Sequence, residues 1–341
     1  MYDDVKKQLN DSKYDFLRKN EHLGRNIILL TIGGSHAYGT NVEDSDIDIR
    51  GCTLNSKADI LTNQNFEQVV DNDTDTTIYA FNKLISLLSG CNPNVIELLG
   101  NRSDAYFYVH PIGQELLDNS KLFLSRRAIN AFMGYATRQF RRLDNKCARD
   151  LSQPEKEKHI LGSVESAFKS FNNTYTAFPN GSINLYVDKS SKEDLDEEIF
   201  VDVSLTKYPL RDFTGLISEM KNVITDYEKL GHRNKNAIVH GKLSKHMMHL
   251  IRLYLMCQDI LEKEEIITYR EKDLSLLMDI RNGKYLDDND KPIPEFFELV
   301  EDLKSKVEYA AENTSLPKNP DFKRINEFVM YVNERVVKGD I

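Results

Sequence analysis

Between residues 26 and 81, apolar positions recur mainly at the spacing expected of strands. The β-branched run "NIILLTIGGS" at 26–35 predicts a buried strand that ends at two glycines. Polar and apolar residues alternate in "SDIDIRGCTL" at 45–54, which predicts a second strand. A third strand is predicted for "TTIYAF" at 76–81. The expected order is strand, glycine turn, short helix, strand, strand.

Helical spacing dominates the rest of the chain. Residues 1–20 predict an amphipathic helix, and "NKLISLLSGCNPNVIELLG" at 82–100 predicts a helix, a turn at Asn92-Pro93 and a second short helix. From about residue 110 apolar residues recur at helical intervals, as in "SRRAINAFMGYATRQFRRL" at 125–143.

The turn-rich, acidic stretch at 179–211 interrupts these helices and predicts an insertion, which we expect to form a hairpin. Helices return from 212 to about 335. The predicted fold class is therefore α+β. A small mixed sheet with helices occupies residues 1–110, and a mainly helical domain occupies residues 111–341.

Composition and charge narrow the class of protein. The 341 residues are 40% hydrophobic and 29% charged, which is ordinary for a soluble globular protein. We find no apolar run of bilayer-spanning length and no apolar signal segment, so we expect a cytoplasmic protein without membrane contact. The four scattered cysteines argue against a zinc site and a disulfide framework. The net charge of −9 disfavours a non-specific duplex binder but is compatible with a local basic patch.

The segment "EDSDID" carries the first candidate chemistry. On a strand, Asp46 and Asp48 would point to the same side, with Cα atoms about 6.5–7 Å apart. Crowded carboxylates repel each other unless cations lie among them. Mg²⁺, or Mn²⁺ in its place, suits this arrangement, because it takes one or two protein carboxylates and completes its shell with water and substrate phosphates. The alternative is a solvated acidic turn.

The glycine turn at Gly33-Gly34 is the second segment with candidate chemistry. Glycines allow a phosphate to approach the backbone, and free N–H groups at a helix start, together with the Ser35 hydroxyl, would bind it. Neither Gly34-Ser35 nor the aspartate pair is specific alone, but their combination ten residues apart predicts a polyphosphate site. His36 either touches the phosphate or the acceptor, or caps the turn.

Together these residues resemble a known pattern. "GGSHAYGTNVEDSDID" resembles the glycine-serine plus Asp-x-Asp signature of the DNA polymerase β-type nucleotidyltransferase superfamily. One branch is more similar still, the predicted nucleotidyltransferases of bacteria and phages that are linked to RNA repair. Its segments "GSHAYGT", "SDIDIRG", "NPNVIELL", "KHMMHLIRL" and "IRNG" occur in the same order between about 33 and 283.

The resemblance implies a minimal nucleotidyltransferase fold with a helical C-terminal extension, and nucleotidyl transfer from an NTP with two divalent metals. Gly34 and Ser35 match its phosphate-binding pair, and Asp46 and Asp48 match two metal ligands. A third carboxylate would ligate one metal and help to deprotonate the attacking hydroxyl. Its candidate here is Asp75, with three alternatives: Asp71, Asp73 and Glu97.

Three further residues are candidates for nucleotide binding. "GKLSKHMMHLIRLYL" at 241–255 predicts a helix with an apolar stripe on one side and cations and imidazoles on the other. Lys245, His249 and Arg252 lie on the polar side, which has no acidic residue. This pattern favours a nearby anion, either a triphosphate or the metal-site carboxylates. The alternative is a basic surface helix without a ligand. Arg50 could balance the aspartates. "IRNG" predicts a helix end at Gly283, and Arg281 could reach the site from there.

The leading hypothesis is a metal-dependent nucleotidyltransferase that releases pyrophosphate from an NTP. Its acceptor would be an RNA or tRNA end, although a protein hydroxyl or a small molecule stays open, as in a toxin–antitoxin or phage-defence enzyme. A non-catalytic nucleotide-binding protein is the alternative from another class. It is disfavoured because such a protein has no reason to keep two repelling carboxylates.

Overall fold

The structure is a computed structural model that describes residues 2–62, 64–147, 152–192, 195–232 and 242–341. The chain divides into two compact units. The first contains Met1–Thr137, Met247–Leu286 and Ile293–Ile341, and the second contains Arg138–His246 and Asp287–Pro292. The C-terminal helices thus return to the unit that contains the N-terminus, whereas the sequence pattern predicted one boundary near residue 110.

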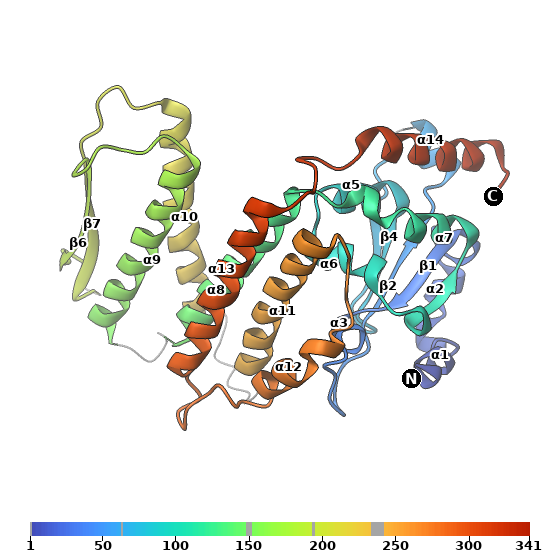
Figure 1. The fold of residues 1–341 in the computed structure, drawn as a ribbon, viewed down its shortest axis with the longest axis horizontal. Coiled ribbons are helices and arrows are strands. Elements are labelled where there is room, and N and C mark those ends of the chain that lie inside the picture. The colour runs from blue at the N-terminus through green and yellow to red at the C-terminus, as the bar shows by residue number, and fades with distance from the viewer. Residues whose placement is uncertain (1, 63, 148–151, 193–194, 233–241) are drawn as a thin grey trace. The chain divides into compact units, whose positions relative to one another are not determined.

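A mixed sheet of five strands lies in the described part of the first unit (Figure 1). Its strand order is β3-β4-β2-β1-β5, and β2 pairs with β4 in parallel while the other neighbours are antiparallel. The strands are β1 Ile27–Ile32, β2 Ile49–Thr53, β3 Gln68–Asp71, β4 Thr76–Ala80 and β5 Tyr106–Val109. The strands expected at 26–35 and 76–81 are confirmed; β3 and β5 were not predicted.

The apolar patterns explain the places of the strands in the sheet. All six residues of β1 are buried, as expected for a central strand covered on both faces. In β4 the buried residues alternate with half-buried ones. Side chains of the N-terminal segment, including Tyr14 and Leu17, join Leu30, Ile32 and Ile49 in one core.

Helices fill the rest of the first unit. They are α1 Asp3–Gln8, α2 Phe16–Lys19, α3 Gly34–Tyr38, α4 Lys57–Thr62, α5 Phe81–Ser89, α6 Pro93–Ile96, α7 Pro111–Asp118, α12 Leu274–Arg281, α13 Pro294–Asn313 and α14 Phe322–Lys338. Helix α5 contacts β2 and β4, and α7 contacts β1 and β5 (Figure 1). The single helix expected at 1–20 is wrong, because a 3₁₀ turn at Ser12–Tyr14 separates α1 from α2.

Two long helices belong to both units, α8 Arg127–Cys147 and α11 Lys242–Lys263. The second unit also contains α9 Gln153–Thr174 and α10 Leu210–His232, which pack on each other. Strands β6 Ile183–Lys189 and β7 Glu197–Val203 form an antiparallel hairpin against α9, which confirms the hairpin expected within 179–211. Among the described residues, no helix could cross a membrane. The α+β class is confirmed.

Candidate functional site

Three neighbouring strands have one terminus each on the same side of the five-stranded sheet, where the strands begin or end. Ile32 of β1 pairs with Ile49 of β2, and Ile49 pairs with Thr76 of β4. Because β1 is antiparallel to β2 and β2 is parallel to β4, the end of β1 meets the starts of β2 and β4. We call this the carboxylate edge; it contains the bend Gly33-Gly34 after β1, Asp48 before β2 and Asp75 before β4.

The Asp48 carboxylate lies directly against the glycine bend. The Gly33 N–H donates to the Asp48 carbonyl oxygen at 2.8 Å. Gly34 has a φ of +58°, and a Cβ added there would lie 1.9 Å from Asp48 Oδ2. A side chain at position 34 would therefore collide with the carboxylate and strain the backbone. Glycine at this position is what allows the carboxylate and the bend to be neighbours.

Neither aspartate of the Asp-x-Asp pair lies within a strand. The expected strand began at Ser45, but β2 begins at Ile49, because residues 42–45 form a turn. In that turn the Ser45 N–H donates to the Val42 carbonyl oxygen at 3.0 Å, and Ser45 Oγ accepts from the Val42 N–H at 2.8 Å. Asp46 follows the turn and is exposed, while the side chain of Asp48 is 24% exposed.

Arg50 links the two strand starts at the carboxylate edge. Its Nη2 donates to Asp48 Oδ1 at 2.9 Å, and its Nη1 donates to the carbonyl oxygens of Ile49 and Asp75. The charge balance expected between Arg50 and the carboxylates is thus present for Asp48. Both side chains are about a quarter exposed, so solvent screens part of this attraction.

Asp75, the candidate for the third carboxylate, precedes β4 as Asp48 precedes β2, and the two strand starts are paired. Its carbonyl oxygen accepts from the Ile49 N–H at 3.3 Å, its φ is +47°, and its side chain is exposed. Asp71 instead caps the turn after β3, where Oδ1 accepts from the Thr74 N–H at 2.9 Å and from the Thr74 hydroxyl at 2.7 Å. Asp73 is exposed within that turn.

Ser35 and His36 lie in the short helix α3 that follows the bend. Ser35 is buried, and its carbonyl oxygen accepts from the Thr40 N–H at 2.9 Å. His36 Nε2 lies 3.4 Å from the carbonyl oxygen of Ser45, so the ring connects α3 to the turn that precedes the aspartates. The carbonyl oxygen of His36 accepts from the Tyr2 hydroxyl at 2.8 Å.

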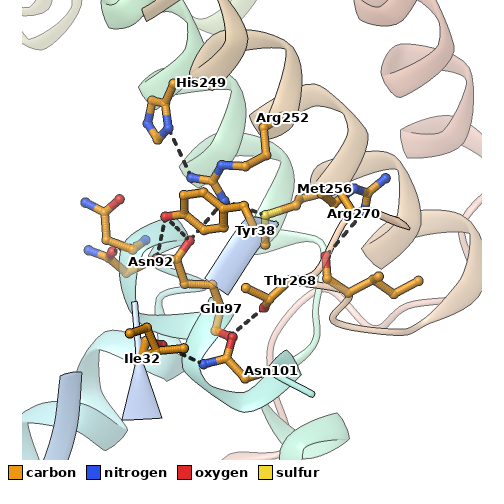
Figure 2. Close-up of polar contacts among 12 residues, drawn as sticks. Ile32, Tyr38, Asn92, Glu97, Asn101, His249, Arg252, Met256, Thr268 and Arg270 are labelled. Atoms are coloured by element: carbon orange, nitrogen blue, oxygen red, sulfur yellow. Dashed lines mark hydrogen bonds and ion pairs between the residues drawn. The ribbon is translucent and has the colours of Figure 1, made fainter. Parts of the chain in front are cut away.

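The last residue of α3 joins a buried polar network (Figure 2). The Tyr38 hydroxyl lies 2.9 Å from Glu97 Oε1 and 3.1 Å from Oε2, and Arg252 Nη1 donates to Oε2 at 3.0 Å. Arg252 Nη2 lies 3.1 Å from His249 Nδ1, and its guanidinium stacks 3.6 Å from the centre of the Tyr38 ring. Burial, opposed by the Arg252 charge and reinforced by Glu97, raises the pKa of Tyr38, so its hydroxyl stays protonated and donates.

Residues 5–160 match the model of the RNA repair pathway DNA polymerase beta family. This match supports, over these residues, the similarity to the DNA polymerase β-type nucleotidyltransferases of the branch linked to RNA repair. The resemblance is thereby confirmed over these residues. They include the carboxylate edge, Tyr38 and Glu97, whereas α11 and α12 lie outside the match. No curated protein and no solved structure matched the chain.

The segment that matches the family model contacts α11 at Arg252, in a way that the helical wheel did not predict. From Met247 to Leu261, α11 is buried or half-buried on all sides, so its polar side is not a cationic surface there. Arg252 is fully buried, and the anion it meets is Glu97. His249 contacts Arg252 and the edge of the Tyr135 ring. Nucleotide binding by these two residues stays a prediction.

Lys245 is exposed and belongs to the second unit, unlike the carboxylate edge. Its binding of nucleotide also stays a prediction. Glu97, an alternative for the third carboxylate, is buried with Tyr38 and Arg252. At the end of α12, Gly283 has the left-handed φ (+86°) expected of a helix-ending glycine.

The donors at the carboxylate edge fit a divalent metal that uses few protein ligands. Among the described residues, no group of three or more His, Cys, Asp or Glu side chains is placed to hold a metal ion. Mg²⁺ commonly takes only one or two carboxylates from a protein, with substrate phosphates and water in the other positions. Metal binding by Asp46 and Asp48 stays a prediction. A metal-binding role for Asp75 stays a prediction.

The sequence analysis missed Ser45, and it named Arg281 as able to reach the site without predicting its contact. Arg281 Nη2 donates to Ser45 Oγ at 3.2 Å across 236 residues of sequence. The position of Ser45 directly before Asp46 was the signal available for the first. No local pattern indicates the second, because the contact depends on where α12 packs.

Proposed function

We propose that the chain is a nucleotidyltransferase that moves a nucleoside monophosphate from an NTP to a hydroxyl group at an RNA or tRNA end and releases pyrophosphate. The observation that carries this proposal is the Asp48 carboxylate against Gly34, where the end of β1 meets the starts of β2 and β4. A polyphosphate at the bend would lie beside the carboxylates. The family match over residues 5–160 supports the same chemistry.

The proposed reaction forms one phosphorus–oxygen bond and breaks another. The acceptor oxygen attacks the α-phosphorus, the bond from that phosphorus to the bridging oxygen of the β-phosphate breaks, and pyrophosphate leaves with the electron pair. Asp75, whose carbonyl oxygen accepts from the Ile49 N–H next to Asp48, would accept the proton of the attacking hydroxyl. Backbone N–H groups at Gly34 and Ser35 would orient the phosphates.

Asp46 and Asp48 would hold Mg²⁺ or Mn²⁺. When bound, the metal neutralises the charge that develops on the transferred phosphate and on the leaving oxygen. Arg50 occupies Asp48 Oδ1 in this structure, and so already provides one positive charge at the carboxylate edge. Two anionic side chains, Asp46 and Asp48, and one cationic side chain, Arg50, thus lie close together in sequence at this site.

The proposed acceptor is RNA because the matching family is that of an RNA repair pathway. A protein hydroxyl and a small molecule are the other acceptors that this chemistry allows. The net charge of −9 would make RNA binding depend on a local basic surface. The base of the NTP is open, and each of the four should be tested.

The test is transfer of label from each of the four α-³²P-labelled NTPs, with Mg²⁺ or Mn²⁺, to total RNA and to protein from the same lysate. We expect label on RNA, with release of pyrophosphate that Asp46→Asn and Asp48→Asn each reduce at least about 100-fold. Asp44→Asn is the matched control, since Asp44 is an exposed acid in the same loop.

If only protein is labelled, the acceptor is a protein hydroxyl and not RNA. Nucleotide binding without pyrophosphate release under every condition would instead favour a non-catalytic nucleotide-binding protein. Equal activity of Asp48→Asn and Asp44→Asn would contradict the placement of the reaction at the carboxylate edge.

A further inference from the structure

Arg281, the last residue of α12, contacts the loop that carries the aspartates. Its Nη2 lies 3.2 Å from Ser45 Oγ, and Ser45 directly precedes Asp46. Both residues belong to the first unit. The Arg281 guanidinium is therefore hydrogen-bonded to Ser45, the residue next to the proposed metal ligand Asp46, although α12 is far from this loop in sequence.

Ser45 has contacts besides the one with Arg281. Its Oγ also accepts from the Val42 N–H at 2.8 Å, and its carbonyl oxygen lies 3.4 Å from His36 Nε2. Helix α3, the aspartate loop and α12 therefore meet at this one residue. Arg281 is held in place by a contact that uses one of its two terminal nitrogens.

The other terminal nitrogen, Nη1, is buried and has no hydrogen-bond acceptor in the part of the chain that the structure describes. No described Asp or Glu forms an ion pair with Arg281, whereas the nearby Lys284 pairs with Asp279 at 2.8 Å. Burial lowers the pKa of Arg281. A desolvated guanidinium without a counter-anion is unfavourable, and an anion that binds beside it would relieve the cost.

We propose that Arg281 binds the β- and γ-phosphates of the NTP and so holds the leaving pyrophosphate. This assignment rests on the proposed function and adds to it a residue from outside the matched family segment. A guanidinium suits the task because its N–H donors can contact two phosphate oxygens at once. The Ser45 contact would fix the distance between this charge and Asp46.

The experiment measures binding to the full chain by calorimetry, with inorganic tripolyphosphate, each NTP and each NMP as probes. Arg281→Met should weaken binding of tripolyphosphate and of the preferred NTP about 10- to 100-fold. Binding of the NMP should change less than about twofold, because the NMP lacks the β- and γ-phosphates. Lys284→Met removes an exposed, paired cation three residues away and should leave all three affinities unchanged.

Ser45→Ala separates phosphate binding from a structural role. It removes the contact with Arg281 but keeps the guanidinium, so we expect at most about a threefold loss of tripolyphosphate affinity. Equal losses in Ser45→Ala and Arg281→Met would assign Arg281 to loop support and overturn the proposal. If Arg281→Met does not fold, Arg281→Lys should show the same selective loss for phosphate-rich probes, reduced to about 3- to 10-fold.

Two failures are distinguishable. Unchanged tripolyphosphate and NTP affinity in Arg281→Met, with Asp48→Asn still inactive, would overturn the role of Arg281 and leave the proposed function standing. A wild-type chain that binds neither tripolyphosphate nor any NTP would overturn the proposed function, and this assignment with it.

Discussion

Arg252 and Glu97 form a buried ion pair between segments 155 residues apart, with Arg252 Nη1 3.0 Å from Glu97 Oε2. Glu97 also accepts from the Tyr38 hydroxyl, and Tyr38 ends the helix that begins at Gly34. The pair therefore fixes one end of α3 while the glycine bend at the other end contacts Asp48. Removing it should disturb both stability and the geometry of the candidate site.

Arg252→Met should lower the free energy of unfolding by about 3–5 kcal/mol, because it leaves the Glu97 carboxylate buried without its counter-charge. Urea unfolding followed by circular dichroism suits this chain, since it has no tryptophan. Glu301→Gln is the control; it breaks an exposed pair with Lys304 and should cost less than about 1 kcal/mol. A loss below about 1 kcal/mol for Arg252→Met would contradict the importance of the pair.

Gly34→Ala should abolish activity, because the new Cβ would lie 1.9 Å from Asp48 Oδ2 and must displace the carboxylate. We expect pyrophosphate release to fall at least about 100-fold. Gly339→Ala is the matched control: Gly339 also has a positive φ, +80°, but no atom within 4 Å of the added Cβ. It should cost about 1–2 kcal/mol of backbone strain and leave activity intact. Equal activity of the two variants would disprove the steric argument.

Asp75→Asn should identify the third carboxylate. If Asp75 accepts the proton of the attacking hydroxyl, the rate of nucleotidyl transfer should fall about 10²- to 10⁴-fold with little change in NTP affinity. Asp73→Asn, in the same turn and exposed, should keep full activity. Asp71→Asn weakens the turn cap at Thr74 and should mainly reduce stability, by about 1 kcal/mol. A larger rate loss in Asp73→Asn than in Asp75→Asn would reverse the assignment.

The buried thiols should be unreactive in the native chain. Cys52, Cys91 and Cys257 are buried, and burial raises the pKa of each, that of Cys257 to about 12. At pH 8 iodoacetamide should modify them only after urea is added, as mass spectrometry of tryptic peptides would show. Modification of Cys257 at the same rate with and without urea would contradict its burial.

The raised pKa values of the buried thiols also make the free energy of unfolding depend on pH. The unfolded thiols ionise near pH 9, whereas the folded Cys257 keeps its proton to about pH 12. Stability from these thiols is therefore fully present below pH 9 and falls as the pH rises toward 12, because the folded state then binds more protons than the unfolded state. The urea midpoint should decline between pH 8 and pH 10.5, and Cys257→Ala should reduce that slope.

The sequence predicted several local features of the fold because they depend on neighbouring residues. A continuous apolar run gave β1, the glycines set the bend after it, and turn residues delimited the hairpin within 179–211. The start of β2 was misplaced by four residues, from Ser45 to Ile49. Polar and apolar residues already alternate in Asp46-Ile47-Asp48, before the first strand residue Ile49, so periodicity alone could not show where the strand pairing begins.

By itself, then, the sequence determined which residues could carry chemistry: a glycine bend, an Asp-x-Asp pair and a choice of third carboxylates. Tertiary structure decided which of them meet. The parallel pairing of β2 and β4 makes Asp75 and Asp48 neighbours at the strand starts. The packing of α11 brings Arg252 to Glu97, and the packing of α12 brings Arg281 to Ser45. These contacts join residues up to 236 positions apart. Helical spacing shows which residues share a face, but not what that face will meet.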